Sequence, residues 1–206
     1  MMETGEIVGK LLPLLFNMMG PIGLMPVFAA VTARMDQPAR NAVALRATLF
    51  SITAVILAVF VGEGILKGWG INNASLIVAA GLILTLSAIR SVLLPAANPA
   101  PNGQDTPDPK GVAVRPVAFP TIISPQGVGV VIIFAAFLPS IEAKSVVLGV
   151  AAFIILIDFG AMRIAHWFMA KVGMVPLMIL GAVFGVLQVA LGVEMIADGL
   201  KLFGRP

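Results

Sequence analysis

The sequence predicts an all-α integral membrane protein with six transmembrane helices, arranged as two inverted three-helix repeats in which helices 1 and 4 are broken. Composition is the first observation behind this fold class. Hydrophobic residues make up 59% of the 206 residues and charged residues 11%, and the mean hydropathy is +1.05. A soluble domain has about 45–50% apolar residues with glycine included, and about 25% charged residues. A chain of this length cannot bury so much apolar surface in a water-soluble core, so a lipid bilayer is its expected solvent.

The lengths of the uncharged runs are the second observation. A spanning helix needs about 20 apolar residues. The runs are continuous rather than alternating, which favours helices over barrel strands. We expect the first run to be a span and not a cleaved leader, because Glu3 and Glu6 replace the basic leader and the run is too long. The six expected spans cover residues 11–33, 41–62, 68–89, 116–141, 145–162 and 172–193.

A single polar segment divides these spans, which is the third observation. It is rich in proline and lacks periodicity, so we interpret it as a linker. We expect a first repeat over 1–95, a cytoplasmic linker over 96–111 and a second repeat over 112–206. Because each half has three spans, related halves would be inverted relative to one another. Pro125 and Gly127 follow Pro21 and Gly23 at an offset of 104 residues, and Gly185 follows Gly81 at the same offset.

Lysine and arginine counts in the loops predict the orientation, since the richer side faces the cytoplasm. The side of the termini carries five such residues: Lys10, Lys67, Lys144, Lys201 and Arg205. The other side carries eight: Arg34, Arg40, Arg46, Arg90, Lys110, Arg115, Arg163 and Lys171. We therefore expect both termini in the periplasm.

The composition also excludes several functions. With no cysteine and one histidine, the chain has no disulfide framework, thiolate nucleophile or histidine-rich metal site. It shows no basic stripe for a nucleic-acid partner. No phosphate-binding loop, nucleophile elbow, zinc motif or acid pair is present. We expect no enzyme activity, catalytic residue, metal or cofactor.

Two prolines indicate the site. Pro21 and Pro125 each lie near the middle of an apolar run, with glycine close by. Proline removes a backbone donor, and a helix broken at membrane depth must face protein or a water-filled cavity. A half-helix that begins at proline directs free N–H groups at an anion, while the carbonyls before the break could accept from an ammonium. Ordinary kinks are the alternative, but paired breaks favour a site for a small zwitterionic substrate.

Polar side chains surround both breaks. Asn17, Thr121, Ser124 and Gln126 could bind substrate, or could instead satisfy the broken backbone or bridge helices. The same two roles are open to Gln188, with bridging favoured. The predicted substrate-binding residues are Asn17, Gly20, Pro21, Gly23, Thr121, Ser124, Pro125, Gln126 and Gly127.

Asp158 is the only acidic residue inside a predicted span. A charge at that depth is costly and indicates function by default. It could take a proton and couple transport to it, or meet a substrate ammonium. A structural pair with an arginine such as Arg46 is the alternative.

At the breaks the sequence resembles a known family. GPIGLMPVF (20–28) resembles the first signature of the MarC family of bacterial inner-membrane proteins, and FPTIISPQGV (119–128) resembles its second. GVLQVALGVEMIADGLKLF (185–203) resembles the family's last span. Gly20 stands where the family usually has Asn or Asp, and Ser124 and Gln126 stand where it has glycine. The arginines often seen at the start of spans 3 and 6 correspond to about Ile77 and Ala182. The chain is identified as a divergent member.

The resemblance implies six spans in two inverted repeats, and movement of small neutral amino acids such as alanine and glycine. We therefore expect a secondary transporter of the bacterial inner membrane that exports or exchanges such substrates by alternating access. The alternative is a cation channel, which would show a continuous wet path. A scaffold subunit would have no reason for matched polar breaks, and an intramembrane enzyme would have only Asp158 as acid or base. A homo-oligomer is compatible with the sequence.

Overall fold

The structure, a computed structural model, describes residues 4–93, 108–137, 140–173 and 175–203, and every element in these ranges is helical. The elements in chain order are α1 (Thr4–Met19), α2 (Pro21–Val31), α3 (Gln37–Gly68), α4 (Asn73–Leu93), α5 (Pro109–Val112), η1 (Ala113–Ile122), α6 (Pro125–Phe137), α7 (Ile141–Val172) and α8 (Val175–Phe203).

The helices confirm the predicted class of an all-α membrane protein. Five candidate spans are long and apolar enough to cross a bilayer, and the first of these, Leu11–Val31, includes the interruption at Gly20. A sixth is obtained if the segment over Pro109–Ile122 and the helix over Pro125–Ala136, which meet at 61°, are one broken span. Helices 1 and 4 are therefore both interrupted, as predicted, and α2 and α6 begin at Pro21 and Pro125.

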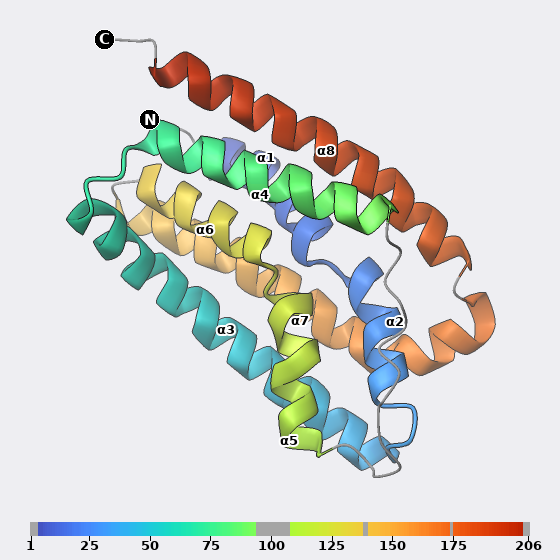
Figure 1. Cartoon of the computed structure of the whole chain (residues 1–206). Helices are drawn as coiled ribbons and strands as arrows, with labels where there is room; N and C mark the ends of the chain where they lie inside the picture. The colour runs from blue at the N-terminus through green and yellow to red at the C-terminus, as the bar shows by residue number, and fades with distance from the viewer. Residues whose placement is uncertain (1–3, 94–107, 138–139, 174, 204–206) are drawn as a thin grey trace.

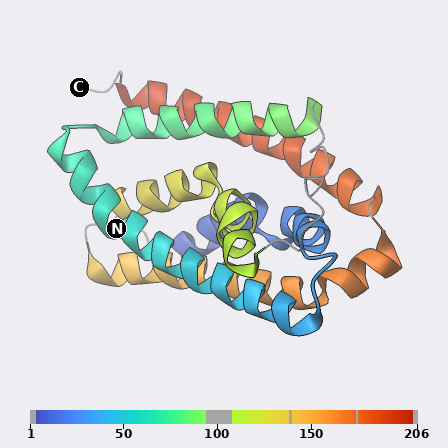
Figure 2. The same cartoon turned by 60° about the horizontal axis from the view of Figure 1, so that its bottom comes forward.

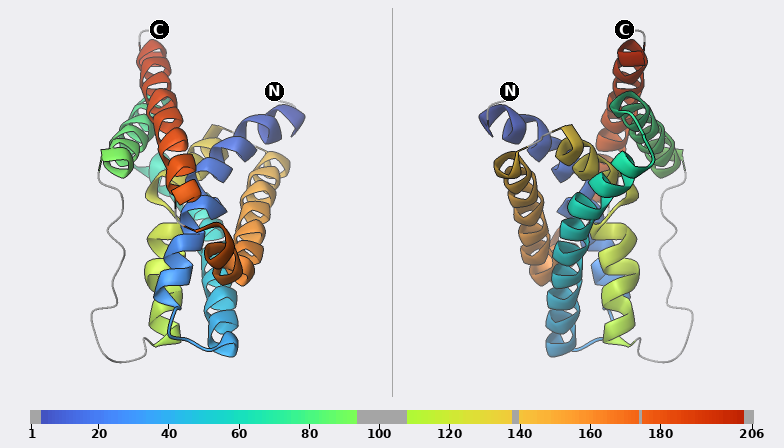
Figure 3. Two further views of the ribbon diagram at one scale, coloured as in Figure 1. Left: turned by 90° about the vertical axis from the view of Figure 1, so that its right-hand side faces the viewer. Right: turned by 90° about the vertical axis from the view of Figure 1, so that its left-hand side faces the viewer.

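The chain crosses the molecule repeatedly from one end to the other. The N-terminus, the α3–α4 turn and the C-terminus lie at one end, whereas α5 and the α2–α3 turn lie at the opposite end (Figure 1, Figure 3). The first broken span (α1 and α2) and the second (η1 and α6) run in opposite directions. An inverted repeat requires that arrangement, and the superposition of the two halves itself stays a prediction.

Helix α7 lies at the centre of the packing. It contacts α1, α2, α3 and α6, and α3 also packs against η1 and α6. The buried core includes Leu24 and Phe28 of α2 and Ile154 and Ile155 of α7. Large apolar side chains on the outer faces, such as those along α8, are exposed, as expected where lipid replaces water.

Helices α4 and α8 form a close antiparallel pair along one side of the molecule (Figure 2). A Cβ added at Gly81 would lie 2.6 Å from the Gly192 carbonyl oxygen, and one at Gly199 would lie 3.1 Å from the Ala74 carbonyl oxygen. Small residues allow helix backbones to approach this closely in membranes. Gly181 and Gly185 of α8 also have the four-residue spacing that is typical of close helix packing, but no described atom lies within 4 Å of a Cβ at Gly181.

This packing gives a stability prediction. Gly192→Ala should destabilise the protein by about 1–3 kcal/mol, because the new Cβ would touch the Thr85 hydroxyl and lie 2.8 Å from the Gly81 carbonyl oxygen. Gly181→Ala, on the same helix, should cost nothing, since its Cβ meets open space. Thermal unfolding in detergent compares the two variants. Equal midpoints would show that α4 and α8 are not held this closely.

The end of the predicted linker is helical. Asp108 caps α5 by accepting from the backbone N–H groups of Lys110 at 3.1 Å and Gly111 at 3.3 Å, as aspartate commonly does at a helix start. Residues 109–111 are therefore helical, residues 96–107 lie outside the described residues, and the bounds of the linker and the two repeats stay a prediction.

Candidate binding site at the two helix breaks

The first break lies at Gly20, between α1 and α2. Gly20 is extended, with φ −85° and ψ 177°, and no side-chain hydrogen bond caps α2 in the described structure. A Cβ at Gly20 would collide with the Phe16 carbonyl oxygen, so glycine allows the backbone to turn here. Proline at the first helical position has no N–H to satisfy. The remaining N–H groups of the first turn, on Ile22 and Gly23, thus have no side-chain cap.

The first turn of α2 is open at Gly23. Pro21 is buried, whereas Gly23 is exposed, and no described atom lies within 4 Å of a Cβ built on it. Helical Cβ positions tilt toward the N-terminus of their helix. The space beside Gly23 therefore adjoins the uncapped end of α2, where partial positive charge is concentrated.

The second broken span is irregular before its break. Arg115 and Phe119 in η1 have extended dihedral angles, as expected for residues that precede proline. The Thr121 hydroxyl donates to the Pro116 carbonyl oxygen at 2.8 Å, and the Ile123 N–H donates to the Ala118 carbonyl oxygen at 2.8 Å. In this structure the Thr121 hydroxyl thus satisfies the interrupted backbone of its own span.

Ser124 joins the two breaks. Its hydroxyl accepts from the Gly127 N–H at 3.1 Å and donates to the Met18 carbonyl oxygen at 3.0 Å. It thereby caps α6 and satisfies a carbonyl left free at the end of α1. The Gly127 N–H, a predicted donor to a substrate carboxylate, is already bonded here, so the two breaks differ in their availability to a ligand.

Gly127 lies where α6 crosses the end of α1. A Cβ there would touch the Met19 side chain, 2.6 Å from its Sδ, and would lie 3.1 Å from the Ser124 Oγ. Gly127 is buried and Pro125 is exposed, the reverse of Gly23 and Pro21. The two Pro-x-Gly motifs therefore match in sequence but not in environment.

Two glutamines connect the breaks to the α4–α8 pair. Gln126 Nε2 donates to the Ser87 hydroxyl on α4. Gln188 Nε2 on α8 donates to the Asn17 carbonyl oxygen at 3.0 Å, so both side chains bridge helices. In contrast, Asn17 Oδ1 is buried and has no hydrogen-bond partner among the described residues. Buried polar atoms without partners are rare, which makes Asn17 Oδ1 a candidate acceptor for a ligand.

Asp158 is fully buried on α7, and neither carboxylate oxygen has a hydrogen-bond partner within the described part of the chain. The alternative interpretation, a structural pair with Arg46, is not seen, because the Arg46 side chain is exposed and Asp158 has no partner among the described residues. Arg163 instead lies over the Phe159 ring, 5.9 Å from its centroid. Within the described residues, therefore, neither a hydrogen bond nor an ion pair accounts for this buried carboxyl group.

A polar cluster at the end of α2 was not predicted. The Thr32 hydroxyl donates to the Phe28 carbonyl oxygen at 2.6 Å and lies 2.9 Å from His166 Nε2. Since its single proton is used, Nε2 is the donor to Thr32. Arg40 donates to the Thr32 and Ala33 carbonyl oxygens at 3.2 and 3.3 Å, which caps the helix. In the sequence His166 is next to Trp167, which favours an interfacial position, and nothing near it in sequence indicates Thr32 as its partner.

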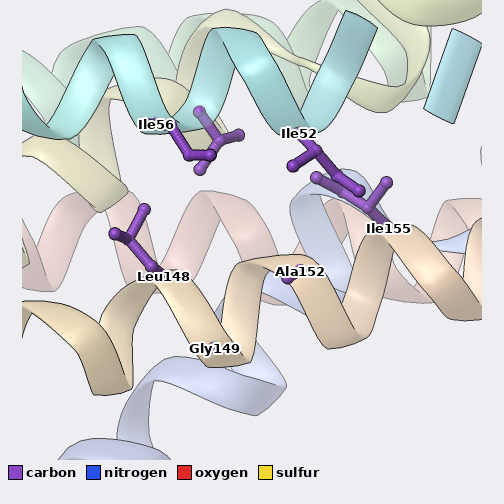
Figure 4. A pocket seen from close by; sticks show the side chains of 7 residues that line it. Ile52, Ile56, Leu148, Gly149, Ala152 and Ile155 are labelled. Carbon is purple, nitrogen blue, oxygen red and sulfur yellow. The ribbon is translucent and has the colours of Figure 1, made fainter. Parts of the chain in front are cut away.

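An apolar cavity of about 260 Å³ lies between α3 and α7 (Figure 4). Its lining includes Ile52 and Ile56 of α3 and Leu148 and Ile155 of α7, with no polar side chain. A small polar ligand needs convergent polar groups, so this cavity does not suit a zwitterion. The described residues also contain no group of three histidine, cysteine or acidic residues that could hold a metal.

Fold and site define a multi-pass α-helical membrane protein in which two interrupted spans meet inside the molecule. The chain belongs to the MarC family, since the family model for MarC family integral membrane proteins matches residues 6–203. This confirms the family that the motifs at the two breaks resemble.

The relatives cover almost the whole chain at low identity. The UPF0056 membrane protein YhcE of Escherichia coli is 26% identical over 190 residues, which is 91% of this chain and 88% of the relative. A UPF0056 membrane protein of Archaeoglobus fulgidus is 25% identical, over 90% of this chain and 88% of its own length. The UPF0056 inner membrane protein YhgN of Escherichia coli is 23% identical, over 92% and 94%. No solved structure matches the chain.

Proposed function

We propose that the protein is a secondary transporter of the bacterial inner membrane that exports or exchanges small neutral amino acids, such as alanine or glycine, by alternating access. Two observations carry the proposal: the end of α2 is open and uncapped, and the amide oxygen of Asn17, three residues before Gly20, is buried without a partner among the described residues. An N-terminal helix end favours a carboxylate, and a carbonyl-type oxygen favours an ammonium. A zwitterion offers both groups without a net charge that lipid would oppose.

The two breaks have different tasks in this proposal. The substrate carboxylate meets the N–H groups of Ile22 and Gly23, and its ammonium meets Asn17 Oδ1. Gly20 and Pro21 create the break and set the direction of α2. This interpretation is supported by the missing cap at Gly20, the open space at Gly23 and the buried, unpartnered Asn17 Oδ1.

In this proposal the second break has a structural role and holds the first break in position. Ser124 and Gly127 hold α6 against the end of α1, and Gln126 ties α6 to α4. Thr121 and Pro125 shape the segment before and at the start of α6. Movement of α6 relative to α1 would then change access to the substrate, which is the kind of step that alternating access requires.

A cation channel is less well supported. It would use carbonyl oxygens freed at the breaks to coordinate the ion. The carbonyl oxygens of Asn17 and Met18 are instead occupied by Gln188 and Ser124. A continuous cation conductance in planar bilayers would favour the channel over the transporter.

Counterflow of labelled alanine in proteoliposomes tests the substrate site. Gly23→Val should reduce the initial rate roughly ten- to hundredfold, because a charge-assisted hydrogen bond is worth about 1.5–3 kcal/mol. The variant should fold, since its side chain enters open space.

Gly64→Val is the matched control, because Gly64 is also helical and exposed with no described atom near its Cβ position. It should transport like the unmodified chain. Normal counterflow by folded Gly23→Val would show that the end of α2 does not bind substrate.

The eight-to-five excess of Lys and Arg on the side away from the termini predicts a periplasmic C-terminus. An alkaline phosphatase fused there should be active, and a fluorescent protein fused there should be dark. The reverse pair of results would place the termini in the cytoplasm.

A further inference from the structure

Helix α2 is hydrogen-bonded to its neighbours at one end. The helix itself, Pro21–Val31, contains no polar side chain, so its own side chains cannot hydrogen-bond to another span. Just beyond its C-terminal end, Thr32 contacts His166 on α7, and the carbonyl groups of Thr32 and Ala33 accept from Arg40 on α3. Its N-terminal end has no side-chain cap in the described structure. Helix α2 is therefore anchored at its C-terminal end and open at the other.

Thr32 is the centre of this anchor. It is fully buried. Its hydroxyl accepts from His166 Nε2 at 2.9 Å and donates to the Phe28 carbonyl oxygen at 2.6 Å. Its carbonyl oxygen accepts from Arg40 Nε at 3.2 Å. One residue thus connects the end of α2 to both α7 and α3.

The apolar contacts of α2 restrain it less specifically. Its buried side chains, Pro21, Leu24 and Phe28, lie on one face, and Thr32 continues this stripe four residues after Phe28. Because lipid tails are as apolar as these side chains, packing them together carries no hydrophobic gain in a bilayer, whereas hydrogen bonds between helices are specific. The rings of Phe28 and His166 also meet edge to face, with centroids 6.3 Å apart, so both contacts at this end involve α7.

The open end of α2 is sensitive to the direction of the helix. It follows Gly20, which is extended with φ −85° and ψ 177°. Gly23 is nine residues from Thr32, or about 14 Å along the helix axis. A tilt of about 10° around Thr32 would therefore move the Gly23 N–H by about 2 Å. A hydrogen bond to a ligand does not survive such a displacement.

We propose that Thr32 and His166 are positioning residues of the substrate site. They anchor α2 to α7 and thereby fix the direction in which the N–H groups of Ile22 and Gly23 point. The inference rests on the proposed function, which places the substrate carboxylate at that end of α2. Loss of the anchor lowers the fraction of molecules whose α2 is correctly directed, and the apparent affinity for substrate falls by the same factor.

Counterflow of labelled alanine tests the effect on the site. Thr32→Val keeps the shape of the side chain and removes the hydroxyl. Its KM should rise about three- to tenfold, the range given by hydrogen bonds between helices in membranes. Its maximal rate per folded protein should stay within about twofold, because positioning affects binding before it affects later steps. Thr32→Ser retains the hydroxyl and should restore the KM.

Thr53→Val is the matched control for Thr32→Val. Like Thr32, Thr53 donates to the carbonyl oxygen four residues earlier, at 2.9 Å. It differs in being exposed, and its hydroxyl has no hydrogen bond to another helix among the described residues. Thr53→Val should therefore transport with the KM of the unmodified protein.

A distance measurement in lipid tests the anchor without any substrate. The chain has no cysteine, so Gly23→Cys and Gly64→Cys provide two unique sites for spin labels. Both glycines are exposed, and a Cβ at either position meets open space. Double electron–electron resonance should give a narrow distance distribution that broadens in Thr32→Val and in His166→Phe. It should stay narrow in Thr32→Ser and in Thr53→Val.

Each outcome decides the proposal. A broader distribution and a higher KM in Thr32→Val, both restored in Thr32→Ser, support it. An unchanged distribution in folded Thr32→Val overturns the anchor, and a broadened one with a normal KM overturns the positioning role. If Thr32→Val does not fold, His166→Phe decides by the same measurements, since it keeps a ring beside Phe28 and lacks the N–H donor. Normal counterflow by Gly23→Val would overturn the proposed function itself, while the distances would still judge the anchor.

Discussion

Replacing Gly127 with valine is expected to abolish counterflow and to destabilise the protein by about 1–3 kcal/mol. The physical reason is the contact between the two breaks. The Cβ atom would overlap the Met19 side chain, 2.6 Å from Sδ, and would press on the Ser124 Oγ that caps α6. Because Ser124 also bonds the Met18 carbonyl oxygen, moving α6 away from α1 would leave that buried carbonyl unsatisfied.

Gly129→Val is the control for this substitution. Gly129 lies two residues further along α6, and no described atom lies within 4 Å of a Cβ at that position. It should therefore retain both stability and counterflow. A similar loss in both variants would mean that valine harms α6 as a helix and that the contact with α1 is irrelevant.

A second substitution identifies the clash itself. Met19→Ala removes the side chain that Gly127→Val would strike, so the double variant should recover much of the stability that Gly127→Val loses. Residues in contact show non-additive effects of about 0.5–3 kcal/mol in double-mutant cycles. Strict additivity of the two free energies of unfolding would contradict the crossing of the breaks at this point.

The positions of the breaks could be predicted from the sequence because proline acts locally. Proline lacks an N–H and suits the first turn of a helix, so Pro21 and Pro125 indicate where α2 and α6 begin, and the structure starts both helices there. Continuous apolar runs likewise predict the spans.

The roles of side chains at the breaks could not be predicted, because their partners are distant in sequence. Ser124 bonds a carbonyl 106 residues away, and Gln188 bonds one 171 residues away. The matching Pro-x-Gly motifs suggested that the N-terminal ends of α2 and α6 would be equally open. Ser124, however, has a hydroxyl that caps α6, whereas Gly20 has no side chain to cap α2. That single difference closes one helix end and leaves the other open.

The packing of α8 against α4 also could not be predicted from local sequence patterns. The four-residue spacing of Gly181 and Gly185 is a common signature for close helices. The pair α4–α8 instead uses Gly81, Gly192 and Gly199, the last two separated by seven residues, or about two turns. Which face of α8 meets α4 depends on the whole bundle, so an apolar helix with several glycines does not reveal it.

Asp158→Asn is expected to remove the response of transport to a proton gradient while leaving counterflow intact. Counterflow is driven by the substrate alone, and Asp158 lies on α7 rather than at the open end of α2. Asparagine keeps the shape of the neutral acid, so the packing around this buried position of α7 should stay intact. It cannot bind and release a proton, so a transport step that requires protonation or deprotonation of this carboxyl group would no longer respond to the gradient.

The measurement is uptake of labelled alanine into proteoliposomes with and without a pH gradient, beside counterflow in the same preparation. Asp198→Asn is the control, because Asp198 is an exposed acid on α8 that pairs with Lys201 at 2.9 Å; both activities should survive there. Loss of only the gradient-driven component in Asp158→Asn assigns proton coupling to this carboxyl group. Survival of both components would make Asp158 structural. Loss of counterflow as well, in a folded variant, would place Asp158 at the substrate, where it would meet the ammonium group.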